Sequence, residues 1–283
     1  MVFEFHGDST LREVVKLLIQ YDNLKGTLEK KDANAGLRVP KIFARPLQNR
    51  HTVLFRFDHT ASHLSEEFFD SAKMNVSSVE VDNIQQSLVN RRHVLVLSLG
   101  LHEAKFHEME APKGQNKNWQ DDLVTPTEDY VVERLTGLVA KRDAKGNFIR
   151  FDTSTKRQVE TVVFFQQTAE CGAMEVAKLD GFKKMAPYCG RIIKAANEGN
   201  ELLGRSFQGQ FGPLSSIAHL SKQHAQHVLK RTQMLAPLNC HGTEPFLFDA
   251  RKPFCTRDGI HLRTKFIRAK LDTLFNIVRN NLC

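Results

Sequence analysis

The chain has 283 residues, of which 41% are hydrophobic and 25% are charged. This composition excludes a disordered or fibrous protein and is typical of a globular domain. Neither an internal repeat nor a linker interrupts the sequence. Single α/β domains of this length are common, so residues 1–283 are predicted to form one domain.

The net charge is +8, because 40 Lys and Arg outnumber 32 Asp and Glu. Such a charge would suit an acidic partner, for example nucleic acid or an anionic glycan. The basic residues are spread along the chain, however, and only three Tyr and one Trp are available to stack on bases. We therefore favour a solvated basic surface, with a basic nucleic-acid-binding protein as the alternative.

The sequence contains no apolar run of about 18 residues, the length that a membrane-spanning helix needs. Met1 leads directly into a strand-like segment, so neither a transmembrane helix nor a signal peptide is expected. A cytoplasmic protein and the excised lumenal domain of an anchored protein both fit this pattern. The compartment is therefore left open.

Five cysteines occur without any Cys-x-x-Cys pair, which argues against a zinc ribbon and against a dense disulfide framework. Cys240 and Cys255 flank the loop before Asp258. A disulfide between them would staple this loop in an oxidising compartment, and two buried free thiols are an equal alternative.

In chain order, apolar runs predict strands at residues 2–5, 52–57, 93–99, 160–165 and 245–248. Longer polar or helical stretches separate these runs, as in parallel crossover connections. Several runs are apolar nearly throughout, which is typical of strands covered on both faces. The pattern predicts an α/β fold, a three-layer αβα sandwich with a mainly parallel central sheet.

The first helix is predicted directly after the first strand, because Leu11, Val14 and Leu18 begin an apolar stripe at helical spacing. Thr10 and Glu13 form a capping-box pattern at its start. A second apolar stripe predicts a closing helix packed on the sheet. This closing helix is predicted at 266–278. Further helices are predicted near 127–142, 182–203 and 215–235, and a surface loop at 111–127.

In the segment Phe5-His6-Gly7-Asp8-Ser9-Thr10-Leu11-Arg12, a serine stands where the first strand gives way to the first helix. A hydroxyl at a helix N-terminus faces unpaired N–H groups and the positive end of the helix dipole. Both can stabilise the oxyanion that forms when the hydroxyl attacks an ester carbonyl. Gly7 is expected to allow a sharp turn. Taken alone, the segment fits a simple N-cap at Ser9 or Thr10 better than a nucleophile.

A serine hydroxyl becomes a useful nucleophile only when a base removes its proton, and that base needs an orienting carboxylate. The segment Asp258-Gly259-Ile260-His261 supplies both groups. One tight turn can direct the two side chains to the same place, so that the carboxylate holds the imidazole in the required tautomer. The alternative is a plain turn before the last helix, with His261 on the surface.

These two segments resemble the first and last conserved blocks of SGNH hydrolases, also called GDSL esterases, in type, order and placement. The longer form Gly7-Asp8-Ser9-Thr10-x-Arg12, together with Asp258-Gly259-Ile260-His261, is similar to the PC-esterase branch. That branch includes plant polysaccharide and sialic acid O-acetyltransferases and neurexophilin-like proteins. Residues 94–102 resemble the strand that leads into the third block, and residues 161–168 agree in kind.

The resemblance implies an SGNH-hydrolase-like fold and a serine-dependent carbohydrate O-acyl, mainly O-acetyl, esterase or O-acetyltransferase. Ser9, Asp258 and His261 would be its catalytic triad, acting through an acyl-enzyme on Ser9. The substrate would be an acylated carbohydrate or glycan, with a separate acyl donor in the transferase reaction. No cofactor and no metal are expected.

The rest of the expected site consists of Gly100, His102, Asp8 and Arg12. The N–H groups of Ser9 and Gly100 would hold the oxyanion, and His102 would line the pocket. Arg12 would either order the site or form a salt bridge. These four residues complete the predicted oxyanion and substrate pocket.

Two departures from the family pattern support a further alternative, a catalytically inactive SGNH-fold protein that binds glycans. No second-block glycine follows the strand at 52–57, and the asparagine of the common third block is absent. Asp58, His59 and His63 follow that strand instead, near the expected mouth of the site.

A separate group of histidines, His219, His224 and His227, falls on a predicted helix with Cys240 and His241 nearby. The spacing of the last two helical histidines could bind a metal. A polar surface helix explains them equally, and no third ligand stands at a diagnostic spacing. We favour the surface helix.

Overall fold

The computed structural model describes residues 1–24, 42–47, 51–57, 60–64, 78–111, 118–166, 169–208, 228, 231–235 and 255–282. Its centre is a six-stranded sheet of order β2-β3-β1-β4-β7-β8, in which only β2 runs antiparallel to its neighbour. The strands are β1 (Val2–Gly7), β2 (Ile42–Pro46), β3 (Thr52–Phe57), β4 (His93–Ser98), β7 (Thr161–Phe165) and β8 (Thr232–Leu235). The predicted α/β fold with a mainly parallel sheet is confirmed.

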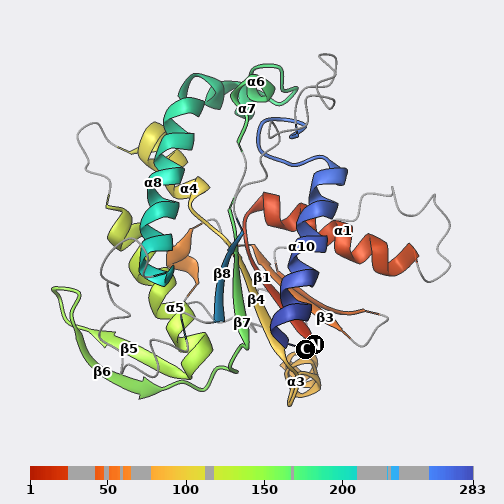
Figure 1. The fold of residues 1–283 in the computed structure, drawn as a ribbon, viewed down its shortest axis with the longest axis vertical. Coiled ribbons are helices and arrows are strands. Elements are labelled where there is room, and N and C mark those ends of the chain that lie inside the picture. The colour runs from red at the N-terminus through yellow and green to blue at the C-terminus, as the bar shows by residue number, and fades with distance from the viewer. Residues whose placement is uncertain are drawn as a thin grey trace.

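Helices cover both faces of the sheet (Figure 1). One face carries α1 (Ser9–Leu24) and α10 (Thr264–Leu282), and the other carries α4 (Leu101–Lys105), α5 (Thr125–Thr136) and α8 (Cys189–Gln208). At the carboxyl end of the sheet lie α6 (Cys171–Glu175) and α7 (Asp180–Met185), whereas α3 (Ser78–Ser87) lies at the opposite end. None of the described helices is long and apolar enough to cross a membrane.

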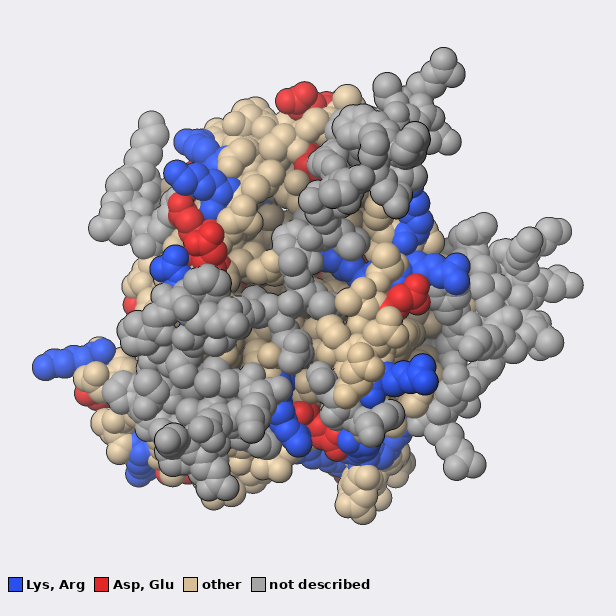
Figure 2. Space-filling model, viewed as in Figure 1, with Lys and Arg blue, Asp and Glu red and all other residues tan. Residues whose placement is uncertain are grey.

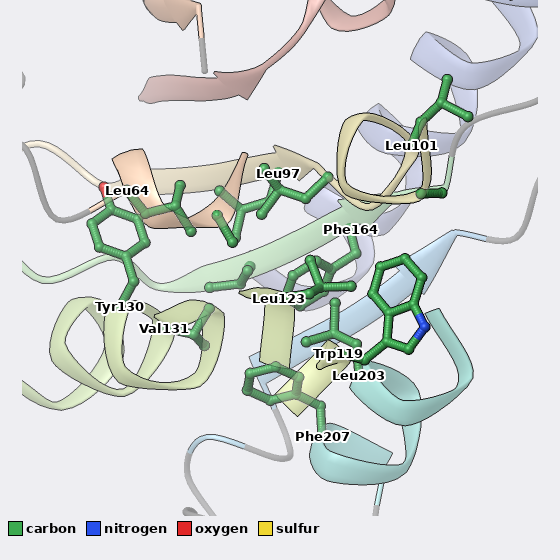
Figure 3. Close-up of a cluster of buried hydrophobic side chains, with 14 of the residues drawn as sticks. Leu64, Leu97, Leu101, Trp119, Leu123, Tyr130, Val131, Phe164, Leu203 and Phe207 are labelled. Atoms are coloured by element: carbon green, nitrogen blue, oxygen red, sulfur yellow. The ribbon is translucent and has the colours of Figure 1, made fainter. Parts of the chain in front are cut away.

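Among the described residues, two large hydrophobic cores fill the spaces between the sheet and the helices on its two faces. The larger joins Leu97 and Phe164 of the sheet to Leu123, Leu203 and Phe207 of the helical layer (Figure 3). The second packs the other sides of β1, β3, β4 and β7 against α1 and α10. Because β4 and β7 are buried on both faces, they carry the nearly continuous apolar runs that made them predictable.

The structure corrects several predicted boundaries. The helix predicted at 127–142 ends at Thr136, because Gly137 adopts the left-handed conformation, with φ of 70°, and closes it. The next residues form β5 (Leu138–Arg142), which pairs with β6 (Phe148–Thr153) in a separate hairpin. The helix predicted at 182–203 is divided into α7, the 3-10 turn η5 (Ala186–Tyr188) and α8.

Other predicted segments are met only in part. The surface loop at 111–127 contains the π-helical segment η4 (Gln120–Val124) and the start of α5. The strand at 245–248 and most of the helix at 215–235 lie outside the described residues, and the end of the latter is strand β8. Further short turns are η2 (Ala61–His63) and the π-helical η3 (Phe106–Glu110), the second of which continues α4.

A disulfide joins Cys171 at the start of α6 to Cys189 at the start of α8. It closes a loop of 18 residues that contains α7. Cys255 is also disulfide-bonded. The pairing of Cys255 with Cys240, one of the two predicted alternatives, falls on a residue outside the described part of the chain.

Candidate active site

Asp8 joins β1 to α1 and caps the helix. Its carboxylate accepts hydrogen bonds from the Thr10 backbone N–H at 2.8 Å and from the Thr10 hydroxyl at 2.6 Å. The N-cap is therefore Asp8, and the predicted capping box of Thr10 and Glu13 is wrong because Thr10 lies inside the helix. Ser9 occupies the first helical position, where its own N–H has no partner within the helix.

Gly7 is needed for space and not for a turn. It is the last residue of β1 and lies in register with Ser98 of β4. A Cβ at this position would lie 2.9 Å from the Ser98 carbonyl oxygen and 3.0 Å from a methyl group of Leu11. The glycine thus lets β1, β4 and the first turn of α1 approach closely just before Ser9.

The structure brings Ser9, His261 and Asp258 together, although 252 positions separate Ser9 from His261. Nε2 of His261 lies 2.9 Å from Oγ of Ser9, and Nδ1 of His261 lies 2.8 Å from Oδ2 of Asp258. The second carboxylate oxygen of Asp258 accepts the backbone N–H groups of Ile260 at 3.2 Å and His261 at 2.9 Å. The three side chains form one continuous chain of hydrogen bonds.

The charge state of Asp258 sets the roles of the two imidazole nitrogens. Burial acts to raise the pKa of Asp258, but hydrogen bonds from the ring and backbone of His261 outweigh it and lower the pKa to about 2. The carboxylate is therefore ionised at neutral pH and accepts a hydrogen bond from the Nδ1–H of His261. This leaves a lone pair on Nε2, directed at the Ser9 hydroxyl, as a general base requires.

The loop that carries Asp258 and His261 is anchored by the buried carboxylate of Glu170, which follows β7. Glu170 accepts the Cys255 N–H at 3.1 Å, the Thr256 N–H at 2.8 Å and the Thr256 hydroxyl. Its own backbone N–H donates to the Gly259 carbonyl at 2.8 Å. Glu170 thereby joins the end of one sheet strand to the loop that holds two members of the triad.

Gly259 makes the tight turn between Asp258 and His261 possible. Its φ is 97°, in the left-handed region that side chains rarely adopt. A Cβ there would also collide with the side chain of Met174 on α6. The turn therefore requires glycine for both conformation and space.

Gly100 follows β4 with φ of 100°, but its N–H is not directed to Ser9. This N–H donates to Oε2 of Glu103 at 2.9 Å, and Oε1 of Glu103 accepts the Ala61 N–H at 2.8 Å. Glu103 is buried, and burial raises the pKa of its carboxyl. The predicted role of Gly100 as an oxyanion donor does not fit this arrangement, because its N–H is already bonded.

The other predicted site residues divide into two groups. His102 lies on α4 with Nε2 3.3 Å from Oδ2 of Asp8, and both side chains line the pocket that opens beside Ser9. Burial acts to raise the pKa of Asp8, but the hydrogen bonds from His102 and Thr10 lower it overall. Arg12 instead packs on the ring of Phe57 at 5.1 Å, and its Nε has no partner within the described residues.

Two contacts of the site were not predicted. The ring of Phe182 on α7 meets that of His261 edge to face, with 5.7 Å between centroids. Glu170 anchors the loop as described above. Neither residue belongs to a short motif, so only the tertiary structure reveals them.

The remaining candidates are His63 and several residues outside the described part of the chain. His63 lies in η2, and its Nδ1 is 3.0 Å from the Thr60 hydroxyl. Asp58 and His59 lie outside the described residues, as do the histidines at 219, 224, 227 and 241. The described part of the chain contains no group of three or more His, Cys, Asp or Glu that could hold a metal.

Comparison with known proteins gives no relative for this chain: no protein-family model, curated protein or solved structure matches it.

Proposed function

We propose that the chain is a serine-dependent carbohydrate O-acyl esterase or O-acyltransferase, with Ser9 as nucleophile, His261 as general base and Asp258 as the carboxylate that orients the base. The observation that carries this proposal is the hydrogen-bond chain from Ser9 through His261 to Asp258. A serine used only as an N-cap would bond to its own helix. Here Asp8 caps the helix, and the Ser9 hydroxyl is paired with an imidazole.

The proposed reaction begins when Nε2 of His261 removes the proton of the Ser9 hydroxyl. Ser9 Oγ then attacks the ester carbonyl, and a tetrahedral oxyanion forms beside the N-terminus of α1, where the Ser9 N–H and the helix dipole stabilise it. Collapse breaks the bond to the alcohol oxygen, which takes the proton from His261. Ser9 is left acylated.

The second half of the reaction reverses these steps. His261 removes a proton from water or from a sugar hydroxyl, whose oxygen attacks the acyl carbon and releases Ser9. Attack by water gives hydrolysis, and attack by a sugar hydroxyl gives transfer. Throughout, the carboxylate of Asp258 stabilises the imidazolium that forms.

An SGNH-type architecture and a PC-esterase relationship are part of this proposal. In support, the Gly7-Asp8-Ser9 segment joins the first strand to the first helix, and the Asp258-to-His261 loop precedes the last helix. Both meet at the carboxyl end of a mainly parallel sheet, where α/β proteins place their ligand sites. The carbohydrate part of the substrate rests on the PC-esterase resemblance.

The described part of one face gives no support to the alternative of nucleic-acid binding. On the face shown in Figure 2, Lys and Arg lie in separate groups with Asp and Glu among them. Proteins that bind nucleic acid gather basic residues in a patch or stripe that follows the phosphates. We therefore retain the esterase or acyltransferase as the proposed function.

Hydrolysis of an aryl acetate by the wild type and by Ser9→Ala tests the proposal. Loss of the nucleophile is expected to lower kcat by about 10⁴-fold or more. Ser87→Ala is the matched control, because Ser87 is an exposed serine at the end of α3, away from the site. Equal activity of Ser9→Ala and Ser87→Ala would refute the proposed nucleophile.

A further inference from the structure

A pocket of about 570 Å³ opens beside Ser9, between α4 and its continuation η3 on one side and α7 on the other. This volume lies in the range of pockets that bind whole small molecules. An acetyl group would occupy only a small part of it. The pocket must therefore accommodate a larger portion of the substrate.

The walls of this pocket are mainly hydrocarbon. The apolar part is formed by Leu101, Met109, Leu179, Phe182, Met185 and Ile260, and the polar part by Asp8, Ser9, His102, Lys105, Glu110 and Lys184. Pockets lined in this way bind the apolar parts of ligands, because such contacts remove apolar surface from water. The walls therefore match an aliphatic group better than a sugar ring.

Several of the polar groups around the pocket bond to one another. Asp8 accepts from Thr10 and is paired with His102, as described above. Lys105 forms an ion pair with Glu110 at 2.7 Å. A sugar ring needs several donors and acceptors that converge on its hydroxyl groups, whereas an aliphatic chain needs none.

The connection between α6 and α7, which supplies Leu179 to the pocket, exposes apolar side chains. Leu179, which lines the pocket, is 63% exposed, and Val176 in the same connection between α6 and α7 is 72% exposed. Of these side chains, Leu179 presents apolar surface at the pocket that an aliphatic ligand would remove from water. The Cys171–Cys189 disulfide closes the loop that contains both residues.

We propose that this pocket binds the acyl chain of the ester, and that the preferred acyl group is a medium-length aliphatic chain and not acetyl. The inference rests on the proposed function, because Oγ of Ser9, which lines the pocket, is the atom that would carry the acyl group. The carbonyl carbon lies at Ser9 Oγ, the chain extends between α4 and α7, and the alcohol part faces the open mouth.

A series of p-nitrophenyl esters from acetate to decanoate measures this preference. Burial of one methylene is expected to raise kcat/KM about fourfold, until the pocket is filled. Butyrate should therefore exceed acetate by about tenfold or more, and octanoate should exceed butyrate.

Leu179→Asp tests the pocket itself, since a charge on this exposed rim residue opposes an aliphatic chain without disturbing the core. It should lower the ratio of kcat/KM for octanoate to kcat/KM for acetate about tenfold. Val89→Asp is the matched control, because Val89 is exposed just after α3 at the opposite end of the sheet. That variant should match the wild type on both esters.

The outcomes separate this inference from the proposed function. If the wild type hydrolyses acetate but gains nothing from longer chains, the acyl-chain assignment is overturned while the esterase proposal stands. The assignment is also overturned if Leu179→Asp, with wild-type Tm, lowers activity on acetate and octanoate equally. If the folded wild type hydrolyses no ester in the series, both proposals fail together.

Discussion

Removal of the Glu170 carboxylate is expected to displace the loop that carries Asp258 and His261, here called the catalytic loop. The carboxylate accepts two backbone N–H groups and one hydroxyl, all from Cys255 and Thr256. In Glu170→Ala these three buried donors lose their acceptor, at a cost of about 1 kcal/mol or more each. The free energy of unfolding should fall by about 3 kcal/mol, and Glu170→Gln, which keeps one oxygen, should lose less.

The effect on catalysis should exceed what the loss of stability explains. Cys255 and Thr256 lie two to three positions before Asp258, so a shift of this segment moves the Asp258–His261 pair away from Ser9. Misplacement of catalytic groups by about 1 Å can cost about 10²-fold in rate. We therefore expect kcat of Glu170→Ala to fall about 10²-fold at temperatures where the variant is fully folded.

Urea unfolding and ester hydrolysis measured on the same samples separate the two effects. The control is Glu175→Ala, which removes an exposed glutamate on α6 and should change neither quantity. Partial recovery of kcat in Glu170→Gln would support a positioning role. A folded Glu170→Ala protein with wild-type kcat would show that the catalytic loop does not depend on this anchor, and the reasoning would be wrong.

Three further predictions follow from other parts of the structure. Glu4 is buried 2.7 Å from Arg134; burial acts to raise its pKa, but Arg134 and His93 lower it from 4.5 to about 2. Because the folded pKa of Glu4 is lowered, its ionised carboxylate stabilises the fold above about pH 4.5, and this contribution is lost as the pH falls toward 2. Glu4→Gln should therefore lower the free energy of unfolding by about 3 kcal/mol at neutral pH and by less in acid. A pH-independent difference between the variant and the wild type in urea unfolding would contradict this. Cys171→Ser should lower the free energy of unfolding by about 3 kcal/mol, because the disulfide closes an 18-residue loop, and a calorimetric Tm equal to that of the wild type would count against the bond. Gly259→Ala should reduce both Tm and kcat, because a Cβ fits neither the positive φ nor the space beside Met174; unchanged ester hydrolysis would exclude the described turn.

Much of the central sheet could be predicted because strands buried on both faces consist mainly of apolar residues. The strands β4 and β7 are buried along their whole length and appear as apolar runs at residues 94–97 and 162–165, whereas the equally buried β1 contains Glu4 and His6. The hairpin of β5 and β6 is half exposed and shows no such run, so it was assigned in part to a helix. Gly137, which ends α5, was the local signal that could have corrected this boundary.

The candidate triad was accessible from sequence because each half of it is local. Ser9 belongs to a strand-to-helix junction, and the Asp258–His261 pair belongs to one turn. Glu170 could not be found in this way, since its partners lie about 85 positions further along the chain and are set by packing alone. For Gly100 a signal existed: a glutamate three residues later, Glu103, is the capping-box position whose side chain bonds back to the N-cap N–H.

Covalent labelling of Ser9 tests the central proposal most directly. The wild type, Ser9→Ala and His261→Ala are treated with a serine-directed phosphonate, and the adduct is located by mass spectrometry. The proposed mechanism predicts a single adduct on Ser9 in the wild type, none in Ser9→Ala and greatly slowed labelling in His261→Ala, because His261 activates the hydroxyl. A folded wild type that is neither labelled nor active on esters would contradict the mechanism and favour an inactive, glycan-binding protein.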